Sequence, residues 1–320
     1  MDKETLISTD KVYRYYGDYC AVENLGFTVS RGEVLGFLGP NGAGKSTTMQ
    51  ILCGVLTPNS GNVSIAGIDM HERPREAKQH LGFLPEQPPL YPDQTVDEYL
   101  SYAARLRGLS KNAVAGAVER SKKRCGLEQT GRRMIKNLSK GFQQRVGIAQ
   151  AVLHSPAVII LDEPTSGLDP IQIREIRDLI RELGEDHSII LSTHILSEVQ
   201  SVCNRVLIIN NGRLVFDQSI ASLGDNKQKT RIIAGFKNLP QAERLLQIPG
   251  VEQVENIDPQ HLLIELETQS NALDDLLSLA VEQGYGLSSL IPQTDTLEEI
   301  FIRLTSTGTD TTTETGETSA

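Results

Sequence analysis

A glycine-rich segment, residues 39–47, carries the residue types that bind a chain of phosphates. It matches the pattern GxxxxGK[ST] and follows the apolar run 34–38. Glycines let successive backbone N–H groups converge on one phosphate, and a helix after the loop directs its positive N-terminus at the same anion. In this pattern Lys45 reaches the β- and γ-phosphates, Ser46 binds Mg²⁺ and Thr47 contacts the α-phosphate. The segment therefore predicts an ATP and Mg²⁺ site rather than a glycine turn that merely caps a helix. The candidate nucleotide ligands are Gly39, Pro40, Asn41, Gly42, Ala43, Gly44, Lys45, Ser46 and Thr47.

Two adjacent carboxylates supply the acidic partner that such a loop needs. Asp162 ends the apolar run 158–161, and Glu163 follows at once. A carboxylate at the end of a buried strand is placed to hold the magnesium shell, and the next one can polarise an attacking water. The alternative is that both residues simply start a turn before Pro164. The phosphate loop upstream favours the catalytic interpretation, with Asp162 serving Mg²⁺ and Glu163 acting as the base.

A further segment carries a family resemblance. Residues 138–145, LSKGFQQR, stand just upstream of VIILDEP and resemble the signature motif of ATP-binding-cassette ATPases. Other matches fall in the order of that family over residues 12–194, and the resemblance to the cassette covers about 1–222. Their joint occurrence in one order is far more specific than any single match. They are Tyr16 for the aromatic residue that stacks on adenine, Gln87 for the Q-loop glutamine, residues 166–169 for the D-loop with its Asp169, and His194 for the switch histidine.

The resemblance implies roles that the residues alone leave open. It implies that Gln87 meets the nucleotide and Mg²⁺ and that His194 bonds to the γ-phosphate. An isolated histidine is otherwise more often structural, and Asp169 is placed to be a helix N-cap as well as a D-loop residue. For the residue that stacks on adenine, the alternatives to Tyr16 are Tyr13, Tyr15 and Tyr19.

The signature departs from the commonest form of the family, LSGGQ. Lys140 replaces its first glycine and Phe142 its glutamine, whereas Ser139 and Gly141 remain. The last two match the positions with which the family touches the γ-phosphate of the opposite subunit. The resemblance therefore implies that two cassettes enclose two ATP molecules head to tail. Because one chain carries one set of motifs, we expect a homodimer.

Three stretches resemble one branch of the family, the ATP-binding subunits of bacterial exporters of the multidrug and gliding-motility type. They are KGFQQR, the stretch 90–109 and the ending TLEEIFIRL. The implied function is ATP hydrolysis that drives a separate membrane permease, for export. One alternative is a soluble cassette ATPase acting on ribosomes or DNA, but such proteins carry two cassettes or a long coiled coil, for which residues 39–138 leave no room. A P-loop phosphotransferase would need neither the signature nor the D-loop.

The elements around these motifs predict an α/β fold with a parallel sheet and a helical insertion at about 88–155, and the resemblance implies a P-loop NTPase core of the ABC ATPase type with an antiparallel β subdomain. Continuous apolar runs such as 158–162 suit parallel strands covered on both faces. In the insertion, Thr95 and Glu98 form a capping box ahead of a helix that reaches about Arg107. The other expected strands are 34–38, 189–193 and 206–209, the last joined by the turn Asn211-Gly212 to 214–216; the other expected helices are 113–126 and 171–183.

A polar linker, 223–228, separates the cassette, 1–222, from a small α+β C-terminal domain, 229–304. Its pattern predicts strands at 230–236, 261–267 and 287–291 and helices at 241–247, 272–283 and 297–304, and suggests a ferredoxin-like fold. The domain either stabilises the homodimer or covers the cassette, with regulation by a ligand or partner as the alternative. The tail 305–320 is rich in Thr, Gly and Glu, which predicts disorder.

The bulk composition limits the compartment and the partners. The net charge of −10 argues against nucleic acid as a partner. The four cysteines are far apart and form no CxxC pair, which suits a reducing compartment. The N-terminus lacks the features of a signal peptide, and no stretch approaches the roughly 18 apolar residues of a membrane span. We therefore expect a cytoplasmic protein, peripheral on the inner face of the cell membrane.

Overall fold

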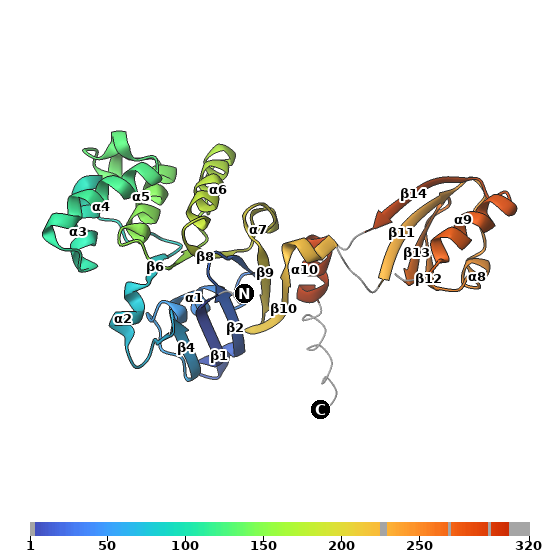
Figure 1. The fold of residues 1–320 in the computed structure, drawn as a ribbon, viewed down its shortest axis with the longest axis horizontal. Coiled ribbons are helices and arrows are strands. Elements are labelled where there is room, and N and C mark those ends of the chain that lie inside the picture. Colours follow the sequence, from blue (N-terminus) through green and yellow to red (C-terminus); the bar gives the residue numbers. More distant parts are fainter. Residues whose placement is uncertain (1–3, 225–228, 268–269, 294–295, 307–320) are drawn as a thin grey trace, which may run out of the picture. The chain divides into compact units, whose positions relative to one another are not determined.

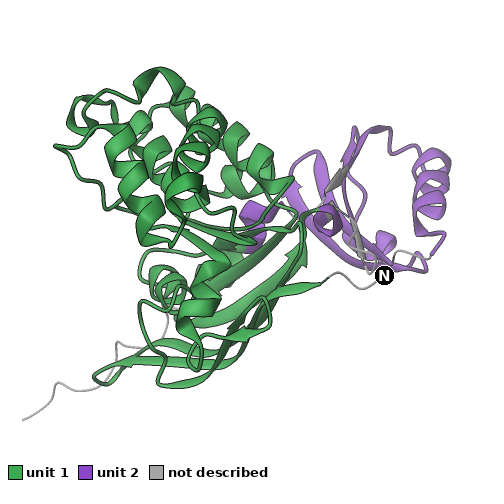
Figure 2. Ribbon diagram, turned by 60° about the vertical axis from the view of Figure 1, so that its left-hand side comes forward, with its two compact units in different colours: residues 1–220, 301–320 green, residues 221–300 purple. Residues whose placement is uncertain are grey.

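The computed structural model describes residues 4–224, 229–267, 270–293 and 296–306 (Figure 1). The chain divides into two compact units, Met1–Ile220 with Phe301–Ala320 and Ala221–Ile300 (Figure 2). The division falls inside helix α10 (Leu297–Ser306), although residues 297–304 were predicted to belong to the C-terminal domain and residues 305 and 306, which are helical, to a disordered tail. The linker residues 225–228 and the tail from 307 onward lie outside the described residues.

A six-stranded sheet forms the centre of the first unit. Its order is β10-β9-β3-β8-β7-β6, with β10 antiparallel to β9 and all other neighbours parallel. Every residue of β3, β7 and β8 is buried, as expected for parallel strands covered on both faces. The strands are β3 (Val34–Leu38), β6 (Leu81–Leu84), β7 (Val158–Asp162), β8 (Ser188–Thr193), β9 (Arg205–Asn210) and β10 (Arg213–Ser219).

A second, antiparallel sheet joins the same core. Its order is β2-β1-β4-β5, and helix α1 (Lys45–Leu52) contacts β2 of this sheet and β7 and β8 of the first. One apolar cluster therefore runs from Val22 through Met49 to Ile160, all fully buried. The strands are β1 (Thr5–Tyr16), β2 (Tyr19–Ser30), β4 (Ser60–Ile65) and β5 (Ile68–Asp69), followed by helix α2 (Pro74–Gln79).

The insertion between β6 and β7 is helical, as predicted. Its helices α3 (Val96–Leu106), α4 (Lys111–Arg124) and α5 (Lys140–Val152) contact one another, and α5 also contacts β6 and β7 (Figure 1). The Thr95–Glu98 capping box is confirmed, because each side chain bonds to the other residue's backbone N–H. Short 3-10 turns cover Glu128–Thr130 and Ile135–Asn137.

Two helices follow the strands that end at the candidate site. Helix α6 (Pro170–Gly184) starts after β7 with Asp169 as its N-cap, as predicted, and α7 (Leu196–Val202) starts after β8. The β9–β10 hairpin turns at Asn211 and Gly212, whose φ angles of 49° and 77° suit a tight left-handed turn. A 3-10 turn, Ile220–Gly224, follows β10.

The second unit has the β–α–β–β–α–β connectivity of a ferredoxin-like domain. Its antiparallel sheet runs β12-β13-β11-β14, and residues of both helices join its buried cluster with Phe236, Ile264 and Leu276. The elements are β11 (Lys229–Phe236), α8 (Ala242–Leu245), β12 (Val251–Asp258), β13 (His261–Glu267), α9 (Ala272–Glu282) and β14 (Leu287–Gln293). Strand β12 was missed from the sequence, and the expected helix 241–247 is shorter than predicted.

Candidate active site

The phosphate loop joins β3 to α1 and depends on glycine at its end. Gly44, the N-cap of α1, has a φ of 104°, and a Cβ there would lie 2.4 Å from the Ala21 carbonyl oxygen. A side chain would therefore be both strained and in collision with the backbone of β2. Because glycine brings no capping side chain, the first N–H groups of α1 remain free to bind an anion.

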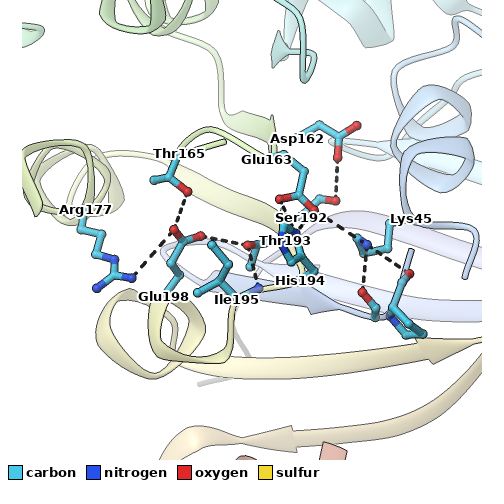
Figure 3. Close-up of polar contacts among 12 residues, drawn as sticks. Lys45, Asp162, Glu163, Thr165, Arg177, Ser192, Thr193, His194, Ile195 and Glu198 are labelled. Atoms are coloured by element: carbon cyan, nitrogen blue, oxygen red, sulfur yellow. Dashed lines mark hydrogen bonds and ion pairs between the residues drawn. The ribbon is translucent and has the colours of Figure 1, made fainter. Parts of the chain in front are cut away.

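Lys45, the first residue of α1, is a buried cation. It is 6% exposed, and its Nζ donates hydrogen bonds to the carbonyls of Gly39 at 2.8 Å and Pro40 at 3.3 Å. The same nitrogen lies 3.8 Å from Glu163 Oε1 (Figure 3). Burial lowers the pKa of the Lys45 ammonium, and the carboxylates of Glu163 and Asp162 oppose this shift. A phosphate chain would act in the same sense as those carboxylates and favour the charged form.

The ends of β7 and β8 bring the acidic pair and the histidine together. Ser192 of β8 donates from its Oγ to Asp162 at 2.7 Å and accepts at its carbonyl from the Glu163 N–H at 2.8 Å. His194 follows β8, and its Nδ1 lies 2.9 and 3.0 Å from the two carboxylate oxygens of Glu163 (Figure 3). Glu163 itself has a φ of 48°, a left-handed conformation that costs about 1–3 kcal/mol for a residue other than glycine. Such strain is characteristic of functional sites.

A cavity of about 640 Å³ opens over the loop, within the range of about 300–1,000 Å³ that small-molecule sites occupy. Both acid–base candidates, Glu163 and His194, line it together with the end of the loop. The lining residues are Tyr16, Tyr19, Ala21, Asn41, Gly42, Gly44, Lys45, Ser46, Thr47, Glu86, Glu163, Ser166 and His194.

The structure narrows the choice of aromatic residue. Tyr16 and Tyr19 line the cavity and are 46% and 57% exposed, whereas Tyr13 stacks on Tyr15 with ring centroids 6.5 Å apart. The Arg14 guanidinium covers the Tyr16 ring at 4.9 Å from its centroid. Tyr16 therefore has a cation near its ring, and Tyr19 is its remaining rival for adenine.

Several predicted residues do not line this cavity. Gln87 is exposed and absent from the lining, where its neighbour Glu86 appears instead. Asp162 is 4% exposed and is held by Ser192. Gly39, Pro40 and Ala43 are also outside the lining, although the first two contribute their carbonyls to Lys45.

The signature residues lie in a cavity of their own, of about 280 Å³. Ser139, Gly141 and Asp169 line it together with Phe142. Ser139 is the N-cap of α5, and Asp169 caps α6 by accepting from the N–H groups of its first turn at 3.0 and 2.9 Å. The fold thus places the two sets of motifs in separate cavities of one chain.

Sequence reasoning missed the polar residues behind the site. Ser192, which orders Asp162 and Glu163, and Glu198, which accepts from Thr165 and Thr193, are both buried (Figure 3). A serine inside an apolar strand and a glutamate in a short helix carry no motif. The available signal was their position: Ser192 stands two residues before His194 in the strand, and Glu198 stands four residues after it in the following helix.

Comparisons with known proteins agree with this geometry. Residues 22–166 match the model of the family described as "ABC transporter", and residues 222–305 match "ATP-binding protein DrrA1-3-like, C-terminal domain". The bacitracin transport ATP-binding protein BcrA of Bacillus licheniformis is 33% identical over 309 residues, which cover 95% of this chain and 99% of that protein. The uncharacterized ABC transporter ATP-binding protein YxlF of Bacillus subtilis is 32% identical over 93% of this chain and 99% of its own.

Solved structures show the same fold. An ATP-binding subunit of an ABC transporter has 32% identity and a TM-score of 0.62, covering 69% of this chain and 92% of its own. The cassette MJ0796, described as a dimer in a post-hydrolysis state bound to ADP and Pi, has a TM-score of 0.61 over 67% of this chain and 99% of its own, and at 24% identity it supports the fold alone.

None of these relatives is named as acting on ribosomes or DNA, so that alternative has no support among them. Within residues 4–224, 229–267, 270–293 and 296–306, no helix has the length and apolar character to cross a membrane. The full-length relatives and the matched family model show that the chain belongs to the ABC transporter family, as an ATP-binding ATPase subunit.

Proposed function

We propose that this chain hydrolyses ATP as one half of a homodimer and thereby drives a separate membrane permease, for export. The observation that carries the proposal is the separation of the motifs. Lys45, Glu163 and His194 line one cavity, whereas Ser139 and Gly141 line another. Two copies arranged head to tail would bring the signature of each onto the phosphates held by the other.

In this proposal the first cavity binds MgATP. Lys45 and Thr47 hold the phosphates together with the loop N–H groups, and Tyr16 stacks on the adenine. Ser46 and Asp162 offer the oxygen ligands that Mg²⁺ prefers, and Ser192 fixes the orientation of Asp162 at 2.7 Å. When bound, Mg²⁺ neutralises charge on the β- and γ-phosphates.

The acid–base chemistry belongs to Glu163 and His194. Glu163 accepts a proton from the attacking water, whose oxygen forms a bond to the γ-phosphorus while the bond to the β-phosphate oxygen breaks and ADP leaves. His194, held 2.9 Å from that carboxylate, orients it and bonds to the γ-phosphate. Lys45 stabilises the charge that develops on the transferred group. Asp169, in the second cavity, belongs to the segment that meets the opposite subunit.

The helical insertion is the proposed contact with the permease. A cavity of about 660 Å³ lies between it and helix α2, lined by Pro89, Tyr91, Tyr99, Tyr102 and Arg107 among others. Tyr91 and Tyr102 are 48% and 40% exposed and lie edge-on to each other, with ring centroids 5.7 Å apart. Aromatic residues beside an arginine are typical of the centre of a protein interface. Gln87, directly upstream, would report nucleotide binding to this contact.

Export and location rest on the relatives. One is a bacitracin transport protein, and the probable multidrug protein YbhF of Escherichia coli is 36% identical over 66% of this chain and 37% of its own. We propose that the chain acts in the cytoplasm at the inner face of the membrane. The C-terminal domain, 229–304, would stabilise the homodimer.

The test is co-purification. The tagged chain, isolated from detergent-solubilised membranes of its own source, should carry a polytopic membrane protein in a fixed ratio. A Tyr91→Ser, Tyr102→Ser variant should lose that protein while its isolated ATPase rate is retained. Sedimentation of the chain with ribosomes, and no membrane protein in either sample, would refute the transporter assignment.

A further inference from the structure

A buried carboxylate behind the cavity has no part in the mechanism above. Glu198, in the first turn of α7, is 1% exposed. The Thr165 hydroxyl donates to its Oε1, the Thr193 hydroxyl donates to its Oε2 at 2.9 Å, and a guanidinium nitrogen of Arg177 lies 3.8 Å from Oε1 (Figure 3). A carboxylate this deeply buried is costly unless it is paired and hydrogen-bonded. The hydroxyls of Thr165 and Thr193 therefore stabilise the buried carboxylate, together with the nearby guanidinium of Arg177.

The two hydroxyls belong to the two segments that carry the acid–base pair. Thr165 stands two residues after Glu163, in the loop that leaves β7, and Thr193 stands directly before His194 at the end of β8. Each oxygen of the Glu198 carboxylate thus holds one of these segments. The same side chain reaches both from α7, so it links them beyond the last pairing of β7 with β8, where the Glu163 N–H donates to the Ser192 carbonyl at 2.8 Å.

The contact between these segments needs such support. Glu163 has a left-handed backbone with a φ of 48°, and its carboxylate lies 2.9–3.0 Å from His194 Nδ1. A strained backbone persists only where its surroundings over-determine it. The His194 side chain is 49% exposed, so packing alone does not hold it in place. The buried bonds from Thr165 and Thr193 to Glu198 lie beside this contact and add to the bond between the Glu163 N–H and the Ser192 carbonyl.

We propose that Glu198 is a positioning residue that sets the spacing between Glu163 and His194. It touches neither the nucleotide nor the reacting water. It acts through Thr165 and Thr193, and it keeps the Glu163 carboxylate aligned with the attacking water in the cavity over the phosphate loop. The inference rests on the proposed roles of Glu163 and His194.

The test separates turnover from binding. Glu198→Ala should lower kcat by about 10- to 100-fold, as loss of an orienting partner behind a catalytic ligand does, and should leave the Kd for ATP within about twofold. Glu198→Gln keeps the length and an acceptor oxygen, so it should recover most of the lost kcat. Arg205→Met is the matched control, because it removes the partner of Glu33 and Asp217 at the far end of the parallel strands. It should lower the melting temperature but not kcat.

A double-mutant cycle decides whether Glu198 acts through His194. In a His194→Ala background, Glu198→Ala should lower kcat by a smaller factor than in the wild type, because the spacing to His194 no longer matters and only the Glu163 segment is still affected. Full additivity of the two losses, or a parallel loss in ATP affinity, would show a merely structural role and overturn the inference. An active wild type with an unchanged Glu198→Ala kcat would also overturn it and leave the proposed function standing. Absence of ATP hydrolysis in the wild type would instead count against the proposed function.

Discussion

The two cavities that carry the motifs are built in different ways. Around the phosphate loop, Gly44 and Glu163 have φ angles of 104° and 48°, and Lys45 and Glu163 are only 6% and 8% exposed. Around the signature, Ser139 and Asp169 are ordinary N-caps with extended backbones, at ψ angles of 159° and 163°. The first cavity therefore contains strain and buried charge, and the second contains neither at these positions.

This difference indicates a division of labour. Strain and desolvated charge are costly and persist where chemistry needs them. The signature cavity instead presents the N-terminus of α5, where the Ser139 hydroxyl can still donate to an anion that another surface already holds, beside the N-terminus of α6, which Asp169 already caps. On this view binding and chemistry belong to the first cavity, and the second completes the site on another copy.

The largest effect is expected from a substitution that removes catalysis but leaves ATP binding intact. Glu163→Gln should lower kcat by about 100-fold or more, the usual contribution of a general base. ATP should still bind, and the variant should accumulate as an ATP-dependent dimer. ATPase assays and light scattering with and without ATP measure both effects. Wild-type turnover in this variant would refute the assignment of Glu163 as the base.

Glu265→Gln is a matched control for that change. This carboxylate of β13 is 6% exposed and pairs with Arg231 at 2.5 Å in the second unit. Its neutral isostere should affect stability but not kcat, because the strands of that unit do not line either cavity of the cassette. An equal loss of kcat in both variants would point to general destabilisation.

The next largest effect is expected from a substitution that weakens ATP binding. Lys45→Ala should weaken the binding of ATP by about 3 kcal/mol, or about 100-fold in Kd, since charge-assisted hydrogen bonds contribute about 1.5–3 kcal/mol each. Calorimetric titration with ATP measures it. Lys122→Ala is the control, because this lysine is 4% exposed and pairs with Asp97 at 2.7 Å and Glu119 at 2.8 Å. Unchanged ATP affinity in Lys45→Ala would contradict the assignment of the loop.

The fold and the site could be predicted from the sequence only where a local motif or apolar pattern marks the residues involved. Residues 39–47 and 158–163 combine an apolar strand with a dense local motif, so both the elements and their chemistry were readable. His194 also lines the cavity over the phosphate loop. Glu198 carries no such local sign, because its importance comes from Thr165 and Thr193, which reach it only in the folded chain.

Strand β12 escaped prediction for a similar reason. Only Val251 of its residues is buried, so the strand lacks the apolar alternation by which strands are identified. Its place at the edge of the sheet comes from backbone pairing with β13, which residue types do not encode. The reduction of the four candidate tyrosines to Tyr16 and Tyr19 likewise needed the fold, because only the turn between them brings both to one cavity.

The smallest effect is expected in the signature cavity. The Ser139 hydroxyl accepts from the Phe142 N–H at 3.4 Å, and its own hydrogen remains available to a phosphate oxygen. Ser139→Ala should lower kcat about tenfold, the equivalent of one hydrogen bond to a charged group. ATP affinity of the dilute chain should be unchanged. Thr296→Ala, which removes a comparable N-cap bond to the Glu299 N–H at 3.2 Å, should leave kcat intact.

Mixing the Lys45→Ala and Ser139→Ala chains and measuring the ATPase rate gives the sharpest test of the head-to-tail dimer. In a head-to-tail dimer of one Lys45→Ala chain and one Ser139→Ala chain, one site combines an intact phosphate loop with an intact signature, and the other combines both defects. An equal mixture forms such dimers in about half of all pairs, so the rate should recover to about a quarter of the wild-type rate. If each chain completed its own site, the mixture would show only the average of the two variants. Recovery therefore requires that the cavities of one chain serve two different ATP molecules.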